Sequence, residues 1–205
     1  LHAHDKIAGV ALGDAGQYLM SLCFCPSCRA GYAGQGQEPD ALVAAVRGAL
    51  EPVWRGDVLD DAADGWQTVL KLLGEERAAA TRAWRDATAA SLQAAAVAAV
   101  RAAAPDGFQV LLHADPVPYH CGANAGVDPA GILSVADGVV VPCAGGAGLL
   151  APFVPHRRAG TVLAANLPVV AGMGGSPGTL AQDAARAAEQ GADELRLYHA
   201  GLASD

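Results

Sequence analysis

The stretch that decides the fold runs from Phe108 to Tyr198 and contains four short apolar segments. They are Phe108–His113 (FQVLLH), Gly138–Val141 (GVVV), Thr161–Ala171 (TVLAANLPVVA) and Glu194–Tyr198 (ELRLY). The residues between them, 129–135, 146–158 and 177–190, have the composition and spacing of helices. Apolar strands that alternate with helices predict a parallel sheet whose faces are covered by those helices.

Two α/β architectures fit this alternation. One is a doubly wound sheet, and the other is the C-terminal half of a (β/α)8 (TIM) barrel, because four strands cannot close a barrel alone. The chain has no Gly-x-Gly-x-x-Gly turn after a strand, and it starts at Leu1 in a polar loop without an initiator Met. We therefore expect a partial barrel, and we expect the chain to be a fragment that forms a single domain.

The part of the chain before these strands is mostly helical. From Pro26 the pattern is helical, and a second helix is predicted from Pro39 to about Leu50. Residues 60–104 form a long helical region with a break expected near Gly74. The expected organisation is a βα loop over residues 1–22, a cysteine knuckle and helical segment over 23–104, and strands and helices over 108–205.

The composition limits the classes of partner. Of 205 residues, 52% are hydrophobic and 17% are charged, which is typical of a globular domain with a sizeable core. A net charge of −8 without a Lys/Arg-rich run argues against a nucleic-acid partner. Arg101 and Asp106 interrupt the alanine-rich stretch, so no membrane span of about 18 apolar residues is present. We expect a small-molecule or carbohydrate ligand, and the oligomeric state stays open.

Three of the five cysteines lie within six positions, at Cys23, Cys25 and Cys28 (CFCPSC). A turn that runs into a helix lets such thiolates converge on one ion, and zinc takes four ligands of this kind in a tetrahedron. This clustering suits metal binding better than disulfides, and it predicts a reducing, cytoplasmic compartment. Buried thiols are the alternative, because free cysteine is also common in protein cores. We expect structural zinc at these three cysteines, with the fourth ligand unknown.

The stretch Ser21–Tyr32 (SLCFCPSCRAGY) resembles the cysteine segment of barrel-shaped glycoside hydrolases, notably the family 42 β-galactosidases. The whole chain is also similar to a group of alanine-rich actinobacterial proteins of glycosidase-like barrel fold, through His2–Lys6 (HAHDK) and Glu194–Leu202 (ELRLYHAGL). The resemblance implies a TIM barrel, a structural zinc knuckle and a carbohydrate substrate. In the family 42 enzymes the fourth zinc ligand lies upstream, so here Cys121, Cys143 or an N-terminal histidine is a candidate replacement.

Reactive residues in α/β barrels lie where the strands end. The first predicted strand ends at His113 and is followed by Asp115 and His120, and the last ends at Tyr198 and is followed by His199. We expect His113 or Asp115 to act as a general acid or base, because both side chains exchange protons. His120, Tyr198 and His199 are candidate substrate-binding residues. A capped, hydrogen-bonded loop is the alternative for this cluster.

The resemblance also assigns the N-terminal loop to the position after the fourth barrel strand, where related glycosidases carry their acid/base carboxylate. It nominates Asp5 as a catalytic residue and His4 as a substrate-binding residue. Retaining glycosidases need a second carboxylate about 5–5.5 Å away, carried after the seventh strand. Leu163–Gly175 contains no Asp or Glu, so that pair cannot be assigned.

Three functions therefore stay open. The first is a glycoside-hydrolase-like enzyme that acts on a carbohydrate. The second is a non-catalytic barrel that binds a carbohydrate or another small ligand, since the second carboxylate is missing. The third is a metal-dependent hydrolase that uses His2 and His4 with His113 or His199, because His-x-His is a metal motif in amidohydrolase barrels.

Overall fold

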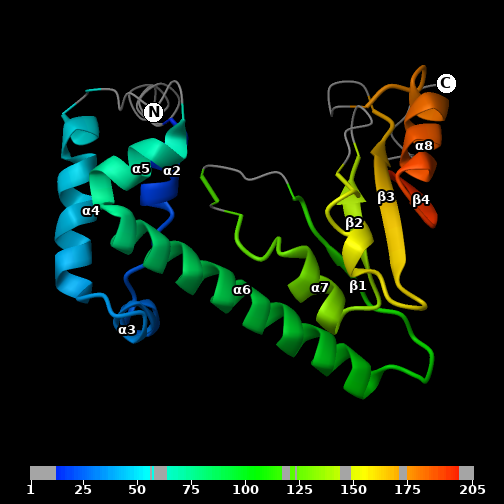
Figure 1. Cartoon of the computed structure of the whole chain (residues 1–205), viewed down its shortest axis with the longest axis horizontal. Coiled ribbons are helices and arrows are strands. Elements are labelled where there is room, and N and C mark those ends of the chain that lie inside the picture. The colour runs from blue at the N-terminus through cyan, green and yellow to red at the C-terminus, as the bar shows by residue number, and fades with distance from the viewer. Residues whose placement is uncertain are drawn as a thin grey trace. The chain divides into compact units, whose positions relative to one another are not determined.

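The computed structural model describes residues 13–55, 57, 64–116, 121–122, 124–143, 149–170 and 175–198. The chain divides into two compact units, which we treat separately (Figure 1). Unit 1 comprises Leu1–Ala87 and Pro118–Ala125, and unit 2 comprises Thr88–Val117 and Gly126–Asp205.

Unit 1 is helical in its described residues. Its helices are α2 (Asp14–Met20), α3 (Pro26–Gly34), α4 (Pro39–Trp54), α5 (Gly65–Leu73) and the first half of α6 (Glu75–Ala103). Two of them begin at acidic N-caps: the Glu38 side chain accepts a hydrogen bond from Ala41 N, and that of Asp64 accepts from Trp66 N and Gln67 N. Such caps satisfy N–H groups that have no partner inside a helix.

The helix positions agree with the sequence prediction except at the N-terminus. Helices α3 and α4 begin where predicted, and Gly74 separates α5 from α6 with a φ of 82°, a left-handed backbone that favours glycine. Residues 1–22 were predicted as a loop, but Asp14–Met20 forms α2. Ala15, Tyr18 and Leu19 lie on one side of this helix and are buried in the unit 1 core.

Unit 2 contains a four-stranded parallel sheet, which confirms the mixed α/β class. Its strands are β1 (Leu111–His113), β2 (Gly138–Pro142), β3 (Val162–Pro168) and β4 (Glu194–Tyr198), arranged in the order β1-β2-β3-β4. The connections contain α7 (Pro129–Val135), the short 3-10 helix η2 (Val154–His156) and α8 (Leu180–Glu189). Helix α8 begins three residues later than predicted because Ser176–Thr179 form a turn, in which Thr179 N donates to Ser176 O.

The two faces of the sheet have different neighbours. Alternate strand residues, among them Val139, Val141, Leu163 and Leu167, form the unit 2 core with residues of α7 and α8 and with Phe153. Because successive side chains of a strand point to opposite faces, the other face receives a second set. By register this set is Leu111, His113, Gly138, Val140, Pro142, Val162, Ala164, Asn166, Pro168, Glu194, Arg196 and Tyr198.

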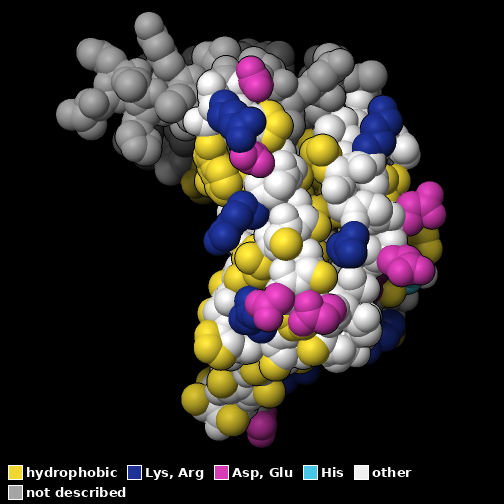
Figure 2. All heavy atoms as spheres, turned by 90° about the vertical axis from the view of Figure 1, so that its left-hand side faces the viewer, with side chains coloured by type: hydrophobic (Ala, Val, Ile, Leu, Met, Phe, Trp, Pro, Cys, Tyr) yellow, Lys and Arg dark blue, Asp and Glu magenta, His cyan; other side chains and the backbone are white. Residues whose placement is uncertain are grey.

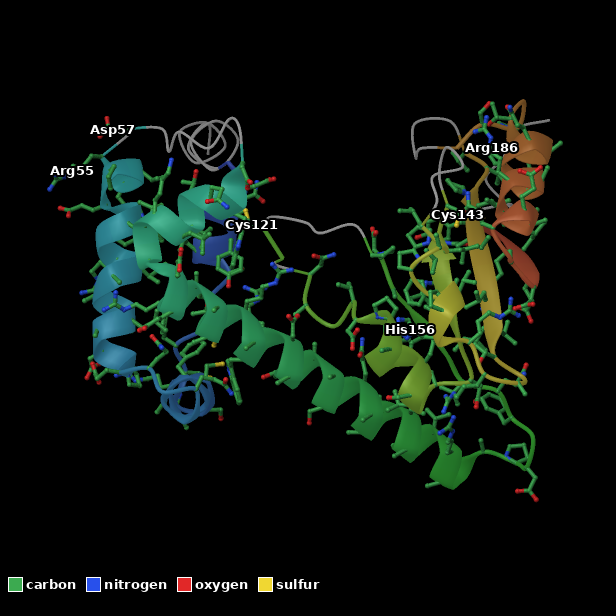
Figure 3. The ribbon with its side chains drawn as sticks, viewed as in Figure 1. Arg55, Asp57, Cys121, Cys143, His156 and Arg186 are labelled. Carbon is green, nitrogen blue, oxygen red and sulfur yellow. The ribbon has the colours of Figure 1, made fainter. Side chains whose placement is uncertain are left out.

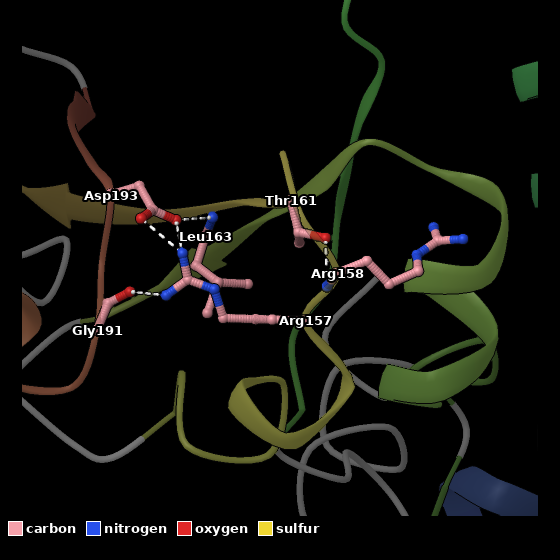
Figure 4. A network of polar contacts seen from close by, with 6 residues as sticks. All are labelled: Arg157, Arg158, Thr161, Leu163, Gly191 and Asp193. Carbon is pink, nitrogen blue, oxygen red and sulfur yellow. Dashed lines mark hydrogen bonds and ion pairs between the residues drawn. The ribbon is translucent and has the colours of Figure 1, made fainter.

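Aspartates hold neighbouring strands together at the amino-terminal edge of this sheet. Asp193, which precedes β4, accepts a hydrogen bond from Leu163 N at 2.9 Å and pairs with Arg157 at 2.7 Å (Figure 4). Asp137, which precedes β2, accepts from Val110 N at 2.8 Å. Its ion pair with Arg101 has the same length of 2.8 Å. Both carboxylates thus serve the start of a strand, far from the carboxyl edge where ligands bind.

Candidate metal centre and strand-end residues

The three clustered cysteines lie on the segment that enters α3. Leu22 is buried, Cys23 is exposed, Phe24 is half-buried and Cys25 is exposed. The ring of Phe24 packs 5.8 Å from that of Tyr32, between centroids, and both rings contact the unit 1 core. This alternation keeps the apolar side chains inside and leaves the two thiols at the surface.

Helix α3 adds the third thiol. Cys25 is the N-cap of α3 and Pro26 its first residue, so Cys28 stands one helical turn from Cys25. The Sγ atoms of Cys23, Cys25 and Cys28 all lie within 4.8 Å of one another. Zinc–sulfur bonds of about 2.3 Å in a tetrahedron need sulfur atoms about 3.8 Å apart. Small side-chain rotations would therefore bring the three thiolates onto one ion.

The local environment acts oppositely on two of these thiols. The pKa of Cys25 is lowered, first by the backbone N–H of Cys28 and then by the side chains of Cys23 and Cys28. Partial burial raises the pKa of Cys28 to about 11, with hydrogen bonds to Cys23 and Cys25 adding to the rise. A bound ion has to displace the Cys28 proton, so binding here depends on pH.

Close packing holds the start of α3 in place. A Cβ atom on Gly31 would lie only 2.1 Å from Cε2 of Trp84, so only glycine at this position lets the indole of α6 lie against α3. Arg85 donates to Ser21 Oγ at 2.5 Å, and Arg29 pairs with Asp40 at the start of α4. The cysteine segment is thereby connected to α4 and α6 within unit 1.

The two remaining cysteines have other surroundings (Figure 3). Cys143 is 2% exposed, donates to Val141 O at 3.4 Å and packs in the unit 2 core, where burial raises its pKa to about 11. Cys121 packs against the unit 1 core next to Gly65. Among the described residues, neither these cysteines nor any His, Asp or Glu joins the three clustered thiols. The suggestion that Cys121 or Cys143 supplies a fourth ligand gains no support from this arrangement.

The strand-end residues predicted from the sequence do not form one cluster in the described sheet. His113 is exposed at the end of β1, Asp115 is half-buried two residues later, and Tyr198 is exposed at the end of β4. Strands lie about 4.8 Å apart, so the two edge strands are separated by about 14 Å across the sheet. His113 is in register with Glu194, and Tyr198 lies four residues, or about 13 Å, further along β4. Asp5, His4, His120 and His199, together with His2, lie outside the described residues.

A polar group on the sheet face opposite the helices is not among the site residues predicted from the sequence. Asn166 of β3 is in register with Arg196 of β4, and Arg196 donates to Glu194 Oε2 at 3.0 Å. The signal was present in the sequence, because Asn166 is the one polar side chain in Val162–Ala171. A near-continuous apolar run predicts a buried strand but does not by itself indicate which of its residues share a face of the sheet.

The charged side chains on the drawn face of the molecule are of both signs. On the face drawn in Figure 2, Lys and Arg side chains alternate with Asp and Glu, without a broad field of one charge. Within the described part of the chain, no helix combines the length and apolar character needed to cross a membrane. Comparison with known protein families, curated proteins and solved structures finds no match for this chain. Any assignment of function therefore depends on the residues themselves.

Proposed function

We propose that this protein binds a zinc ion through Cys23, Cys25 and Cys28, and that the ion has a structural role. The convergence of three Sγ atoms within 4.8 Å carries this proposal. Thiolates are soft ligands that select zinc and a few other thiophilic ions over magnesium or calcium. When bound, zinc would supply a cross-link that stabilises the fold.

The position of the cysteines favours a structural role over a catalytic one. Cys23 precedes α3, Cys25 caps it and Cys28 lies in its first turn, so one ion would fasten the entry segment to the helix. Cys28 also packs against the unit 1 core, which would connect the site to the interior. Among the described residues the cluster contains no imidazole or carboxylate that could act as a general base beside the ion.

Cobalt binding tests this proposal directly. The reduced full-length chain is titrated with Co²⁺, and thiolate-to-cobalt absorption in the near ultraviolet is measured, followed by displacement with Zn²⁺. We expect one ion per chain, and an affinity at least 10-fold weaker in Cys28→Ser. Cys143→Ala is the matched control, because that thiol is buried in unit 2 and should not change the titration. Unaltered binding by Cys28→Ser would contradict the proposal.

A second function, carbohydrate recognition by a glycoside-hydrolase-like partial barrel, is favoured by the topology of unit 2. The strands follow one another in the order β1-β2-β3-β4, whereas the strand order of a doubly wound sheet reverses at its switch point. Residues of α7 and α8 belong to one core cluster on the same face of the sheet. Helices on a single face are expected for the wall of a barrel.

The face opposite these helices would then line the barrel interior. His113, Asn166 and Arg196 provide donors and acceptors there, and Asp115 follows the end of β1. Within this proposal His113 or Asp115 exchanges a proton, and Asn166 holds a sugar hydroxyl. Strand β3 and the two residues after it, 162–170, contain no Asp or Glu. Their absence favours binding without hydrolysis as the form of this second function.

Calorimetry with a panel of oligosaccharides, combined with an assay for released reducing sugar, distinguishes the two variants. Heat of binding with no product would support a binding protein, and product formation would support an enzyme. Asn166→Ala should weaken binding by about 10-fold, corresponding to one lost hydrogen bond. Ser134→Ala on the exposed side of α7 is the control. If no oligosaccharide of the panel gives heat of binding or product, this second function is wrong.

A further inference from the structure

Cys25 and Cys28 have the arrangement of a dithiol in addition to that of metal ligands. Their Cys-Pro-Ser-Cys spacing is a Cys-x-x-Cys motif, and it occupies the N-cap and first turn of the nine-residue helix α3. Thiols in such motifs at helix N-termini are typical of disulfide exchange. Cys25 is exposed to solvent, while Cys28 is half-buried behind it against the unit 1 core.

The geometry allows these two sulfur atoms to bond. A disulfide needs Cβ atoms about 3.5–4.5 Å apart, and residues three apart on a helix have Cβ atoms about 5–6 Å apart. Cys25 has extended backbone angles, with φ −63° and ψ 164°, so it can shift without unwinding the helix. The Sγ atoms already lie within 4.8 Å of each other. Cys23 lies before the helix, so the helix does not fix its position relative to Cys25 as it fixes that of Cys28.

We propose that Cys25 and Cys28 are oxidised to a disulfide by small-molecule disulfides of the glutathione type, and that this oxidation removes two of the three ligands of the metal site. The loss of the ion rests on the proposed function above, whereas formation of the disulfide does not. The cluster would then hold its ion only under reducing conditions.

The exchange balances in two steps. Cys25 Sγ attacks one sulfur of the small disulfide, which forms a mixed disulfide and releases the first small thiolate. Cys28 Sγ then attacks Cys25 Sγ, which breaks the mixed disulfide, forms the Cys25–Cys28 bond and releases the second small thiolate. Two electrons pass from the protein to the small disulfide, and the two released thiolates take up protons from water or from the cysteines.

The cysteines outside the cluster should not interfere. Cys143 is buried in the unit 2 core, and Cys121 does not lie within 4.8 Å of the cluster sulfur atoms. Of the two thiols of the motif, Cys25 is exposed and Cys28 is half-buried, so Cys25 is expected to react first. Cys28, one helical turn away, can then resolve the mixed disulfide.

Oxidised glutathione is the probe for this proposal. The zinc-loaded, reduced full-length chain is treated with an excess, released zinc is followed with a chromogenic chelator, and the disulfide is mapped by peptide mass spectrometry. We expect loss of the bound ion, loss of two of the five thiols, a Cys25–Cys28 bond as the main product, and recovery after dithiothreitol. Cys143→Ala should behave like the parent chain.

Two variants separate the steps. Cys28→Ser should accumulate glutathione on Cys25, because the second step is lost. Cys25→Ser should gain little adduct on Cys28, because Cys28 is half-buried. Circular dichroism establishes that both variants remain folded. Retention of the ion by the oxidised parent chain, or a main product that contains Cys23, would overturn the proposal. If the reduced chain binds no ion and still forms the Cys25–Cys28 bond, the metal function fails and the dithiol assignment stands.

Discussion

Two buried polar side chains in unit 1, those of Tyr18 and Thr81, are paired with each other. Tyr18 is fully buried, and its hydroxyl lies 2.8 Å from Thr81 Oγ1. Thr81 in turn donates to Ala78 O at 2.9 Å, so its single proton is already used and Tyr18 acts as the donor to Thr81. The Tyr18 ring meets Trp66 edge-on at 5.5 Å. This pair connects α2 to α6 through a hydrogen bond as well as through apolar packing.

Removing the Tyr18 hydroxyl should destabilise unit 1 without affecting the cysteines. We expect Tyr18→Phe to lower the free energy of unfolding by about 1 kcal/mol, the usual contribution of a buried hydrogen bond. Tryptophan fluorescence in urea is a selective readout, because Trp54, Trp66 and Trp84 all belong to unit 1. A double-mutant cycle with Thr81→Val should show coupling, and strictly additive losses would argue against the hydrogen bond.

The buried thiol of Cys143 should make unit 2 less stable at high pH. Burial raises its pKa from 9.0 to about 11, so the folded state favours the neutral thiol. The resulting stability is complete below pH 9 and is lost as the pH rises towards about 11. Between pH 9 and pH 11 the free energy of unfolding of the parent chain should fall by on the order of 1–2 kcal/mol more than that of Cys143→Ala. Pulse proteolysis in urea measures both values. If the free energy of unfolding of the two proteins changed equally with pH, the raised pKa of Cys143 would be disproved as the cause.

At the scale of elements, the junction between α5 and α6 depends on one backbone angle. Gly74 has a φ of 82°, and the space beside it is open, so a methyl group there would meet no neighbour. Any cost of a side chain at this junction therefore comes from the backbone conformation alone. Gly48, within α4, has equally open space and no positive φ, which makes it a matched comparison.

Alanine at these two glycines should have opposite effects. Gly74→Ala should destabilise unit 1 by about 1–2 kcal/mol, because an L-residue is strained in the left-handed region. Gly48→Ala should stabilise it by about 0.5–1 kcal/mol, because alanine loses less entropy in a helix. Both are measured by tryptophan fluorescence in urea. The same sign for both substitutions would show that α5 and α6 are not separated as described.

The Asp193 carboxylate joins β3, β4 and Arg157, so its removal should weaken unit 2. Asp193→Ala leaves the Leu163 N–H without its acceptor, and we expect a loss of about 1–3 kcal/mol. Amide hydrogen exchange of β3 and β4 measures the effect. Asp106→Ala is the control, because Asp106 is exposed in the turn before β1. Equal losses in both variants would mean that the carboxylate contributes only surface charge.

At the scale of the whole molecule, the two units carry different candidate chemistry. Unit 1 contains the cysteine cluster within a helical core, and unit 2 contains the parallel sheet with its polar face. Each unit has its own core cluster of buried residues. A ligand that stabilises one unit is therefore expected to leave the core of the other largely unchanged.

Metal removal should reveal this division. If zinc fastens the start of α3, a chelator should speed amide exchange in α3 and in α2, which packs in the same core, while exchange in β2 and β3 stays the same. Hydrogen-exchange mass spectrometry of the zinc-loaded and stripped chain makes the comparison. Uniform acceleration across the sheet would show that the ion supports the whole fold and not one unit.

The sequence alone determined the features that depend on neighbours along the chain. Strand β4 has the predicted limits, α7 spans the predicted residues 129–135, and the helical region breaks at Gly74. The cysteine cluster was also visible, because the spacing of Cys23, Cys25 and Cys28 requires only a short turn to bring the thiols together. Apolar periodicity, glycine conformations and short loops are local properties, so the residues themselves express them.

The tertiary structure decided what depends on residues distant in sequence. Helix α2 was missed although Ala15, Tyr18 and Leu19 have helical spacing, because its partners Trp66 and Thr81 lie far along the chain. The separation of His113 from Tyr198 and the pairing of Asn166 with Arg196 follow from strand order and register. The burial of Cys143 depends likewise on packing between the sheet and its helices. Such contacts form only when the chain folds back on itself, so no local pattern specifies them.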